Sequence, residues 1–119
     1  MALCDQGYLC EVCGEDVACL TESDLYLRYV IGELDPEVLH TTPERHLRCN
    51  PVLAQFIDHP SFEPVRVEGM FDRRQLDPEF VAERVRWVTR GYERLRELEA
   101  LGGESDVTGY PLPEVIAKW

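Results

Sequence analysis

The sequence contains little positive charge. Its 119 residues include 12 basic residues, among which Lys118 is the single lysine, against 23 acidic residues, and the net charge at pH 7 is −11. Binding to the phosphates of nucleic acids or to anionic lipid surfaces depends on a basic surface. The composition therefore disfavours non-specific binding to nucleic acid and to membranes.

Long apolar runs are also missing. No stretch approaches the ~20 apolar residues of a membrane-spanning helix, and the first residues, MALCDQGYLCEV, lack the basic and apolar regions of a secretory signal. We therefore expect a cytoplasmic protein that forms one domain over residues 1–119. Cytoplasmic thiols stay reduced and the cysteine count of five is odd, so a disulfide framework is not expected.

Motifs of catalysis are equally scarce. No nucleophile–base pair, glycine-rich phosphate loop or nucleotide-binding motif stands out, so the sequence gives no support for an enzyme. The segment Asp58-His59-Pro60, together with His40, resembles a fragment of the HNH nuclease motif, which implies a metal-dependent hydrolase. That segment follows a predicted helix instead of lying on a hairpin, and the acidic chain lacks a basic groove for DNA, so this alternative is disfavoured.

The sequence does contain two pairs of metal-binding residues with the same spacing. Two residues separate Cys10 from Cys13, which is followed by Gly14, and two residues separate His46 from Cys49. This spacing lets both side chains of a pair reach one ion from a tight turn, and the glycine allows the positive φ of such a turn. Cysteine sulfur and histidine nitrogen are the usual ligands of tetrahedral zinc, so the two pairs predict a complete Cys3His site.

The ligand pattern resembles a treble-clef zinc finger over residues 8–58. In that fold group a CxxCG knuckle, here CEVCG at 10–14, precedes a β-hairpin, and a second ligand pair, here HLRC at 46–49, lies at the start of a helix. The resemblance implies an α+β fold in which zinc stabilises a module of knuckle, hairpin and short helix. With four protein ligands the zinc is expected to be structural, because a catalytic zinc keeps one position open for water.

Two alternatives to this ligand set stay open. Cys19 lies six residues after Cys13 and could replace His46, which would give an all-cysteine zinc site. Four of the five cysteines could instead hold an iron–sulfur cluster, although the close spacing of cluster-binding runs is absent. The simplest interpretation of Cys19, and of Cys4, is a thiol that packs as a small apolar side chain.

The segments around the second ligand pair predict short elements. Residues 25–34, LYLRYVIGEL, are rich in aromatic and β-branched residues, which favours a strand, with a short return strand at 38–40. Helix starts marked by proline predict a turn at 43–48 and a helix at 51–58. The alternating segment 62–71 contains a proline and predicts an edge strand.

The best-marked element is a long amphipathic helix over residues 78–101. Asp77 is a cap, a proline occupies the first helical position, and Gly102 follows the last turn. Apolar residues recur at spacings of four and three, and they define the face expected to pack on the zinc module: Val81, Val85, Val88, Tyr92 and Leu95. Gly91 costs the helix about 1 kcal/mol relative to alanine and predicts close approach by another element. Residues 104–119 follow as an extended tail.

The function predicted from these features is that of a protein-interaction or adaptor module. Its interaction surface is expected on the long helix and the tail, with these residues: Trp87, Arg90, Arg94 and Trp119. The protein is expected to be a monomer, or a homodimer formed through the long helix. The alternative is a nucleic-acid- or ribosome-associated zinc protein that uses the arginines of this helix, although the interleaved acidic residues favour ion pairs within the helix.

Overall fold

Helix α3, Pro78–Ala100, is the longest element and confirms the helix predicted at 78–101. Asp77 occupies the cap position, and Gly102 follows the last turn with a left-handed φ of 69°, which glycine adopts without strain. The predicted apolar stripe faces the interior along the C-terminal part of the helix, where the buried residues are Val88, Gly91, Tyr92, Leu95 and Leu98. Val81 and Val85, nearer the start, are half-buried.

The computed structural model describes residues 8–17, 19–39, 41–102 and 107–118. The described residues form a small helix-rich domain with little strand, and their buried apolar side chains make one contiguous cluster. In the described ranges, no helix combines the length and the apolar character that crossing a bilayer requires.

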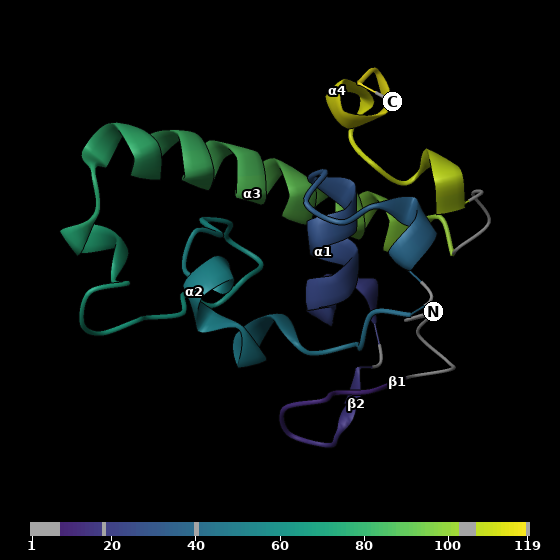
Figure 1. The fold of residues 1–119 in the computed structure, drawn as a ribbon, viewed down its shortest axis with the longest axis horizontal. Helices are drawn as coiled ribbons and strands as arrows, with labels where there is room; N and C mark the ends of the chain where they lie inside the picture. The colour runs from purple at the N-terminus through teal and green to yellow at the C-terminus, as the bar shows by residue number, and fades with distance from the viewer. Residues whose placement is uncertain (1–7, 18, 40, 103–106, 119) are drawn as a thin grey trace.

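Helix α1, Asp24–Val30, replaces the strand predicted at 25–34, so that prediction is wrong. Ser23 caps the helix, because its hydroxyl oxygen accepts a hydrogen bond of 3.0 Å from the N–H of Tyr26. The helix crosses α3 (Figure 1) and is buried on almost every side; its buried residues are Asp24, Leu25, Tyr26, Leu27, Tyr29 and Val30. A helix surrounded by the core needs no polar face, so its sequence lacks the 3.6-residue periodicity that identifies helices.

The crossing of α1 and α3 is tightest at Gly91. A Cβ atom at this position would overlap Cγ2 of Ile31 and lie 2.9 Å from Cδ1 of Leu27. Only glycine therefore allows the two helix backbones to approach this closely. The predicted close approach at Gly91 is confirmed, and the approaching element is α1.

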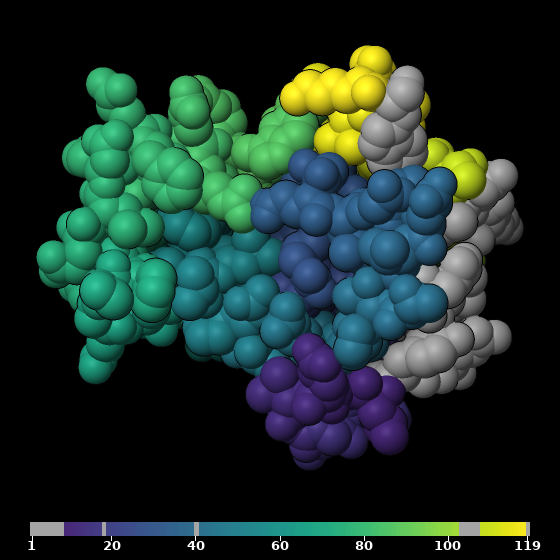
Figure 2. All heavy atoms as spheres, viewed as in Figure 1, coloured from purple at the N-terminus to yellow at the C-terminus, as the bar shows by residue number. Residues whose placement is uncertain are grey.

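The strands of the described residues flank the cysteine knuckle. Strand β1, Tyr8–Leu9, pairs antiparallel with β2, Asp16–Val17, and Leu9 lies opposite Asp16. In Figure 2 this hairpin, in purple, projects from one edge of the molecule. Residues 11–16 of this hairpin are exposed, whereas Cys10 and Val17 beside them are buried in the core.

The other predicted strands are also wrong. Pro36–Val38 forms a short 3₁₀ helix in place of the return strand at 38–40, and residue 40 lies outside the described residues. The segment 62–71 contains turns and no strand. A strand needs a hydrogen-bonded neighbour, and the described part of the chain has one sheet, made of β1 and β2 alone.

The tail predicted as extended over 104–119 is partly helical and folds back on the domain. Helix α4, Pro113–Ile116, lies near the C-terminal end of α1 (Figure 1). Just before it, the N–H of Leu112 donates a hydrogen bond of 3.0 Å to the carbonyl of Val30. The tail is therefore hydrogen-bonded to the last turn of α1.

Candidate metal centre

Cys10 and Cys13 lie in the turn that joins β1 and β2. The N–H of Cys10 donates to the carbonyl of Glu15 at 2.8 Å, and the N–H of Gly14 donates to the carbonyl of Cys10 at 2.9 Å. Gly14 has a φ of 78°, the conformation for which the sequence places glycine after the knuckle. These backbone bonds close the knuckle into a tight turn.

The second pair of ligands lies at the entry to helix α2, Pro51–Ala54. His46 occupies the cap position of a 3₁₀ turn, Leu47–Cys49, and the N–H of Cys49 donates to the His46 carbonyl at 3.0 Å. This single turn brings the two side chains of the pair together. The helix predicted at 51–58 is present in shorter form as α2, whereas the turn predicted at 43–48 is replaced by the 3₁₀ turn at Leu47–Cys49.

The structure brings the four predicted ligands together. One ligand atom each from Cys10, Cys13, His46 and Cys49 lies within 4.8 Å of all the others. The Nδ1 atom of His46 is 3.3 Å from Sγ of Cys13 and 3.8 Å from Sγ of Cys49. Tetrahedral zinc with its usual bond lengths places sulfur and nitrogen ligands about 3.6 Å apart. The separations therefore fit four ligands around one ion.

A backbone carbonyl orients the imidazole of His46. Its Nε2 atom lies 2.7 Å from the carbonyl oxygen of Asp16 on β2. A carbonyl can only accept, so Nε2 carries a proton, and the lone pair of Nδ1 would face the thiols when the ring is neutral. Burial lowers the pKa of His46, but the Asp16 carbonyl and the Cys10 thiol outweigh burial and raise it overall. Histidine ligands of metals are oriented by hydrogen bonds of this kind.

The Cys10 thiol lies in a setting that stabilises its anion. Cys10 is 2% exposed, and its sulfur accepts N–H groups of Val12 and His46 at 3.4 Å each. Burial acts to raise the pKa of Cys10, but the backbone N–H donors outweigh it and lower the pKa to about 6. The sulfur is thereby prepared to act as a thiolate ligand.

The Cys49 thiol lies in a setting that disfavours its anion. Burial, together with the neighbouring thiols of Cys10 and Cys13, raises the pKa of Cys49 to about 11. Three sulfur atoms this close cannot all carry negative charge unless a positive charge lies between them. A divalent cation at the centre of the cluster would supply that charge and keep all three as thiolates.

The centre is open to solvent on one side. Cys13 is exposed, whereas His46 and Cys49 are half-buried. A cavity of about 490 Å³ adjoins these three residues and is also lined by Phe62 and Tyr92. An ion in the cluster would therefore be within reach of chelators.

The remaining predicted site residues do not join the cluster. Cys19 is not part of the group of four, so the described residues do not support the all-cysteine alternative. His59 packs against the ring of Tyr92, with 5.2 Å between ring centroids. Cys4 and His40 lie outside the described residues.

The residues predicted for interaction make contacts inside the protein. The Nε1–H of Trp87 donates to the carbonyl of Ile31 at 3.0 Å. Arg90 forms a two-pronged ion pair with Glu114 on α4, one contact of which measures 3.0 Å. Arg94 donates to the backbone carbonyls of residues 109 and 110 at 2.9 Å each. Arg90 and Arg94 thus fasten the tail to α3, whereas Trp87 joins α3 to the end of α1. Trp119 lies outside the described residues.

Sequence reasoning missed three residues behind the cluster, Asp24, Arg45 and Asn50. Asp24 is fully buried and accepts hydrogen bonds from both of the others. The sequence contains one signal for it, since Ser23 and Asp24 precede an apolar run as cap and first residue of a helix. Nothing in the sequence indicates its long-range partners.

Comparison with known proteins gave no match: no family model fits the chain, and neither a curated protein nor a solved structure resembles it. The fold and the candidate site therefore rest on the geometry described above.

Proposed function

We propose that this protein binds one zinc ion through Cys10, Cys13, His46 and Cys49. The observation that carries the proposal is the convergence of four ligand atoms within 4.8 Å from two pairs that are 33 or more residues apart in the chain. Three thiolates and one imidazole are a preferred ligand set for zinc. An iron–sulfur cluster held by four cysteines is not favoured, because the fourth member of the group is a histidine.

The proposed role of the ion is structural. Four protein ligands complete a tetrahedral shell, whereas catalytic zinc keeps one position for water or substrate. The ion would tie the knuckle between β1 and β2 to the segment that leads into α2. Since that hairpin has two residues in each strand, metal bonds would add to the few polar contacts that hold it in position.

The arrangement of ligands is proposed to be treble-clef-like. A knuckle with CxxCG supplies the first pair, and the second pair lies directly before helix α2, as in that fold group. The element between the two pairs differs, because α1 occupies the place of the expected hairpin. The likeness is therefore proposed for the ligand framework and not for the connecting chain.

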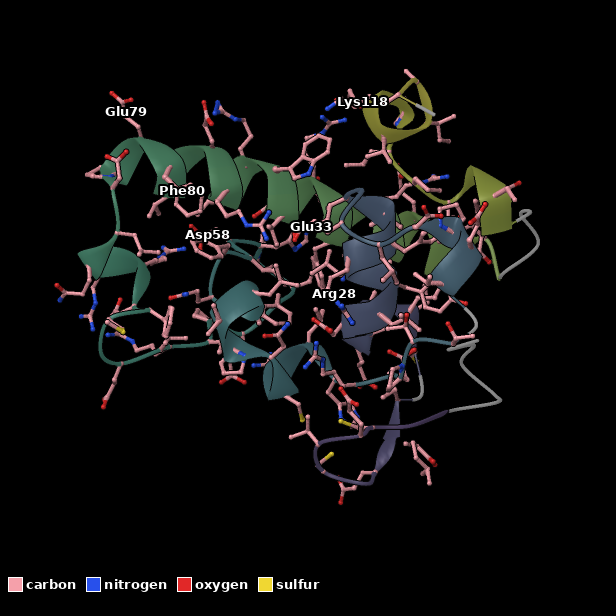
Figure 3. The ribbon with its side chains drawn as sticks, viewed as in Figure 1. Arg28, Glu33, Asp58, Glu79, Phe80 and Lys118 are labelled. Carbon is pink, nitrogen blue, oxygen red and sulfur yellow. The ribbon has the colours of Figure 1, made fainter. Side chains whose placement is uncertain are left out.

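We further propose that the protein acts in the cytoplasm as an adaptor for other proteins. The net charge of −11 opposes a nucleic-acid role. Arg84, Arg90 and Arg94 on α3 form ion pairs with Glu33, Glu114 and Glu97, so they are engaged within the chain. Apolar side chains exposed near the start of α3 are the feature that supports protein contacts: Met70, Phe71 and Phe80. Figure 3 shows Phe80 on the side of α3 opposite to Glu79.

Metal analysis of the purified protein tests the site. We expect one zinc per chain by mass spectrometry after anaerobic purification, and none in Cys13→Ala or His46→Ala. Cys19→Ala is the matched control and should retain the metal, because Cys19 is not in the cluster. Iron with visible absorbance, or a wild-type protein without metal, would refute the zinc proposal.

The adaptor role needs a separate test. A partner captured by the zinc-loaded protein should bind again when both proteins are pure, and Phe71→Ser with Phe80→Ser should weaken that binding. Charge variants on the opposite end of the helix, such as Glu97→Gln, should not. Binding to RNA that weakens steeply with added salt would instead favour the nucleic-acid alternative.

A further inference from the structure

Asp24 lies behind the metal centre and is the most completely buried acidic residue of the described chain, with 0% exposure. It is the first residue of α1 and does not belong to the group of metal ligands. A buried carboxylate is costly unless donors surround it. The identity of its donors therefore indicates what this residue holds in place.

The donors come from the segments that carry the second ligand pair. Oδ2 of Asp24 accepts from Nε of Arg45 at 2.9 Å, and Arg45 directly precedes His46. Oδ1 accepts from the side-chain amide of Asn50 at 2.8 Å, and Asn50 directly follows Cys49. A third bond of 3.0 Å comes from Arg28, one turn along the same helix (labelled in Figure 3). One carboxylate thus accepts hydrogen bonds from the residues on both sides of the His46–Cys49 pair.

Backbone contacts also join the start of α1 to the chain at His46. The N–H of Asp24 donates to the carbonyl of Arg45 at 2.9 Å, so these two residues are joined through side chain and main chain. Directly beside them, Ser23 and His46 form an isolated antiparallel bridge. The backbone at His46 is therefore held by the N-terminus of α1.

The same network reaches the knuckle. Nη1 of Arg45 lies 3.7 Å from a carboxylate oxygen of Glu11, which stands between the two knuckle cysteines. The N–H of Glu11 also donates to the carbonyl of Glu44 at 2.9 Å. Through Arg45 and Asn50, the buried carboxylate is connected to both segments that supply ligands.

We propose that Asp24 is a positioning residue for the metal centre. By holding Arg45 and Asn50 it fixes the spacing of His46, Cys49 and the knuckle before the ion binds, and it sets the metal affinity without touching the metal. This inference rests on the proposed zinc site and adds a residue that determines its affinity. Groups that hydrogen-bond the ligands themselves change metal affinity by about 10–100-fold when they are replaced. Asp24 acts on the residues directly next to the ligands, so we expect an effect in the same range.

The test compares the full-length wild type with Asp24→Asn. Asparagine keeps the size but replaces one acceptor oxygen with an amide donor that faces the donors of its neighbours. Zinc affinity is measured by competition with a chromophoric chelator, at a temperature where each metal-free protein is still folded. We expect Asp24→Asn to bind zinc about 10–100-fold more weakly, and the visible spectrum of its cobalt complex to depart from the tetrahedral pattern of the wild type.

Leu27→Ala is the matched control, because it removes packing from the same helix and leaves the network around Asp24 intact. Leu27 is fully buried against α3. It should lose stability, yet keep the zinc affinity and the cobalt spectrum of the wild type. If Asp24→Asn does not fold, Asn50→Ala breaks only the bond next to Cys49 and should lower the affinity with the same spectral change.

Two results would overturn the inference. Asp24→Asn, or Asn50→Ala in its place, could bind zinc as tightly as the wild type, or Leu27→Ala could lose as much affinity as the network variant. Either result with a zinc-binding wild type would refute the role of Asp24 and leave the proposed function standing. A wild type that binds no zinc would refute the proposed function itself.

Discussion

Replacing Gly91 with alanine is expected to destabilise the protein, although alanine is the better helix former by about 1 kcal/mol. The new Cβ would overlap Cγ2 of Ile31 and lie 2.9 Å from Leu27 and 3.5 Å from Val30. Leu27 and Val30 lie in α1 and Ile31 directly follows it, and all three are buried at 0–4% exposure, so none can swing into solvent. Overpacking of this kind costs about 1–3 kcal/mol. With the cost at the upper end, the net loss is about 2 kcal/mol.

Urea denaturation of the zinc-loaded protein, followed by circular dichroism, measures this loss. Arg86→Ala is the control on the same helix, because Arg86 is exposed and has no hydrogen bond or ion pair among the described residues. Its free energy of unfolding should stay within about 0.5 kcal/mol of the wild type. If Gly91→Ala is as stable as the wild type or more stable, the two helices do not cross as closely as the structure shows.

A double-mutant cycle locates the clash. Ile31→Ala alone removes a buried side chain and should cost about 2–5 kcal/mol. In the double variant with Gly91→Ala, the added methyl group occupies space that the isoleucine has left. The combined loss should therefore be smaller than the sum of the single losses by at least about 0.5 kcal/mol. Additive losses would mean that Ile31 does not contact position 91.

Three other perturbations have defined outcomes. Ser23→Ala should cost about 2–3 kcal/mol in urea denaturation, because it removes the cap of α1 and a 2.8 Å hydrogen bond to the buried carboxylate of Glu44. The ion pair with Arg90 lowers the pKa of Glu114 to about 2. The pair should therefore stabilise the tail above about pH 4, and this stabilisation should be lost as the pH falls towards 2. A carboxyl NMR titration of Glu114 with its midpoint near 4 would contradict the pairing. Removing the metal with a chelator should raise hydrogen exchange in residues 8–17 and leave α1 and α3 protected, because these helices have a core of their own. A uniform loss of protection would mean that the helices also depend on the metal.

The four residues of the candidate metal centre could be predicted because their signals are local. A spacing of two residues between ligands follows from the geometry of one turn, and Gly14 has the positive φ expected after a knuckle. The combination of the pairs follows from chemistry, since neither pair alone completes a tetrahedral shell. Helix α3 was predictable for the same reason, because its cap, first proline and terminal glycine all lie at its own two ends.

Helix α1 was not predictable from periodicity, because its surroundings differ from those of a surface helix. Leu25, Tyr26 and Leu27 follow each other along the chain, and all three are buried. Such a run suits a buried strand as well as a buried helix, and aromatic and β-branched residues favour the strand. Two features favour the helix: Ser23 caps its first turn, and its side chains pack closely against Gly91. The second feature is a long-range contact.

The strand predicted at 62–71 is wrong for another reason. Its alternating pattern matches a strand, but a strand exists only where a neighbouring edge can accept its hydrogen bonds. The two-residue strands of the knuckle offer no such edge, and the segment's backbone is instead held by side chains: Gln55 donates to the carbonyl of Phe71 at 2.8 Å, and Arg48 donates to that of Glu63 at 3.1 Å. Side-chain partners of this kind leave no periodic trace in a sequence.

The same distinction explains how the four proposed ligands come together without the predicted hairpin. In a treble clef the hairpin has the task of bringing two local ligand pairs together, and any rigid element that does so is sufficient. Here α1 begins between the pairs in the chain, and the carboxylate at its first position is bonded to residues 21 and 26 positions further on. Ligand identity is thus encoded in short spacings, whereas ligand placement depends on a buried polar contact between distant residues. A single change at Asp24 should therefore disturb the site more than any substitution in the exposed parts of the knuckle between its ligands.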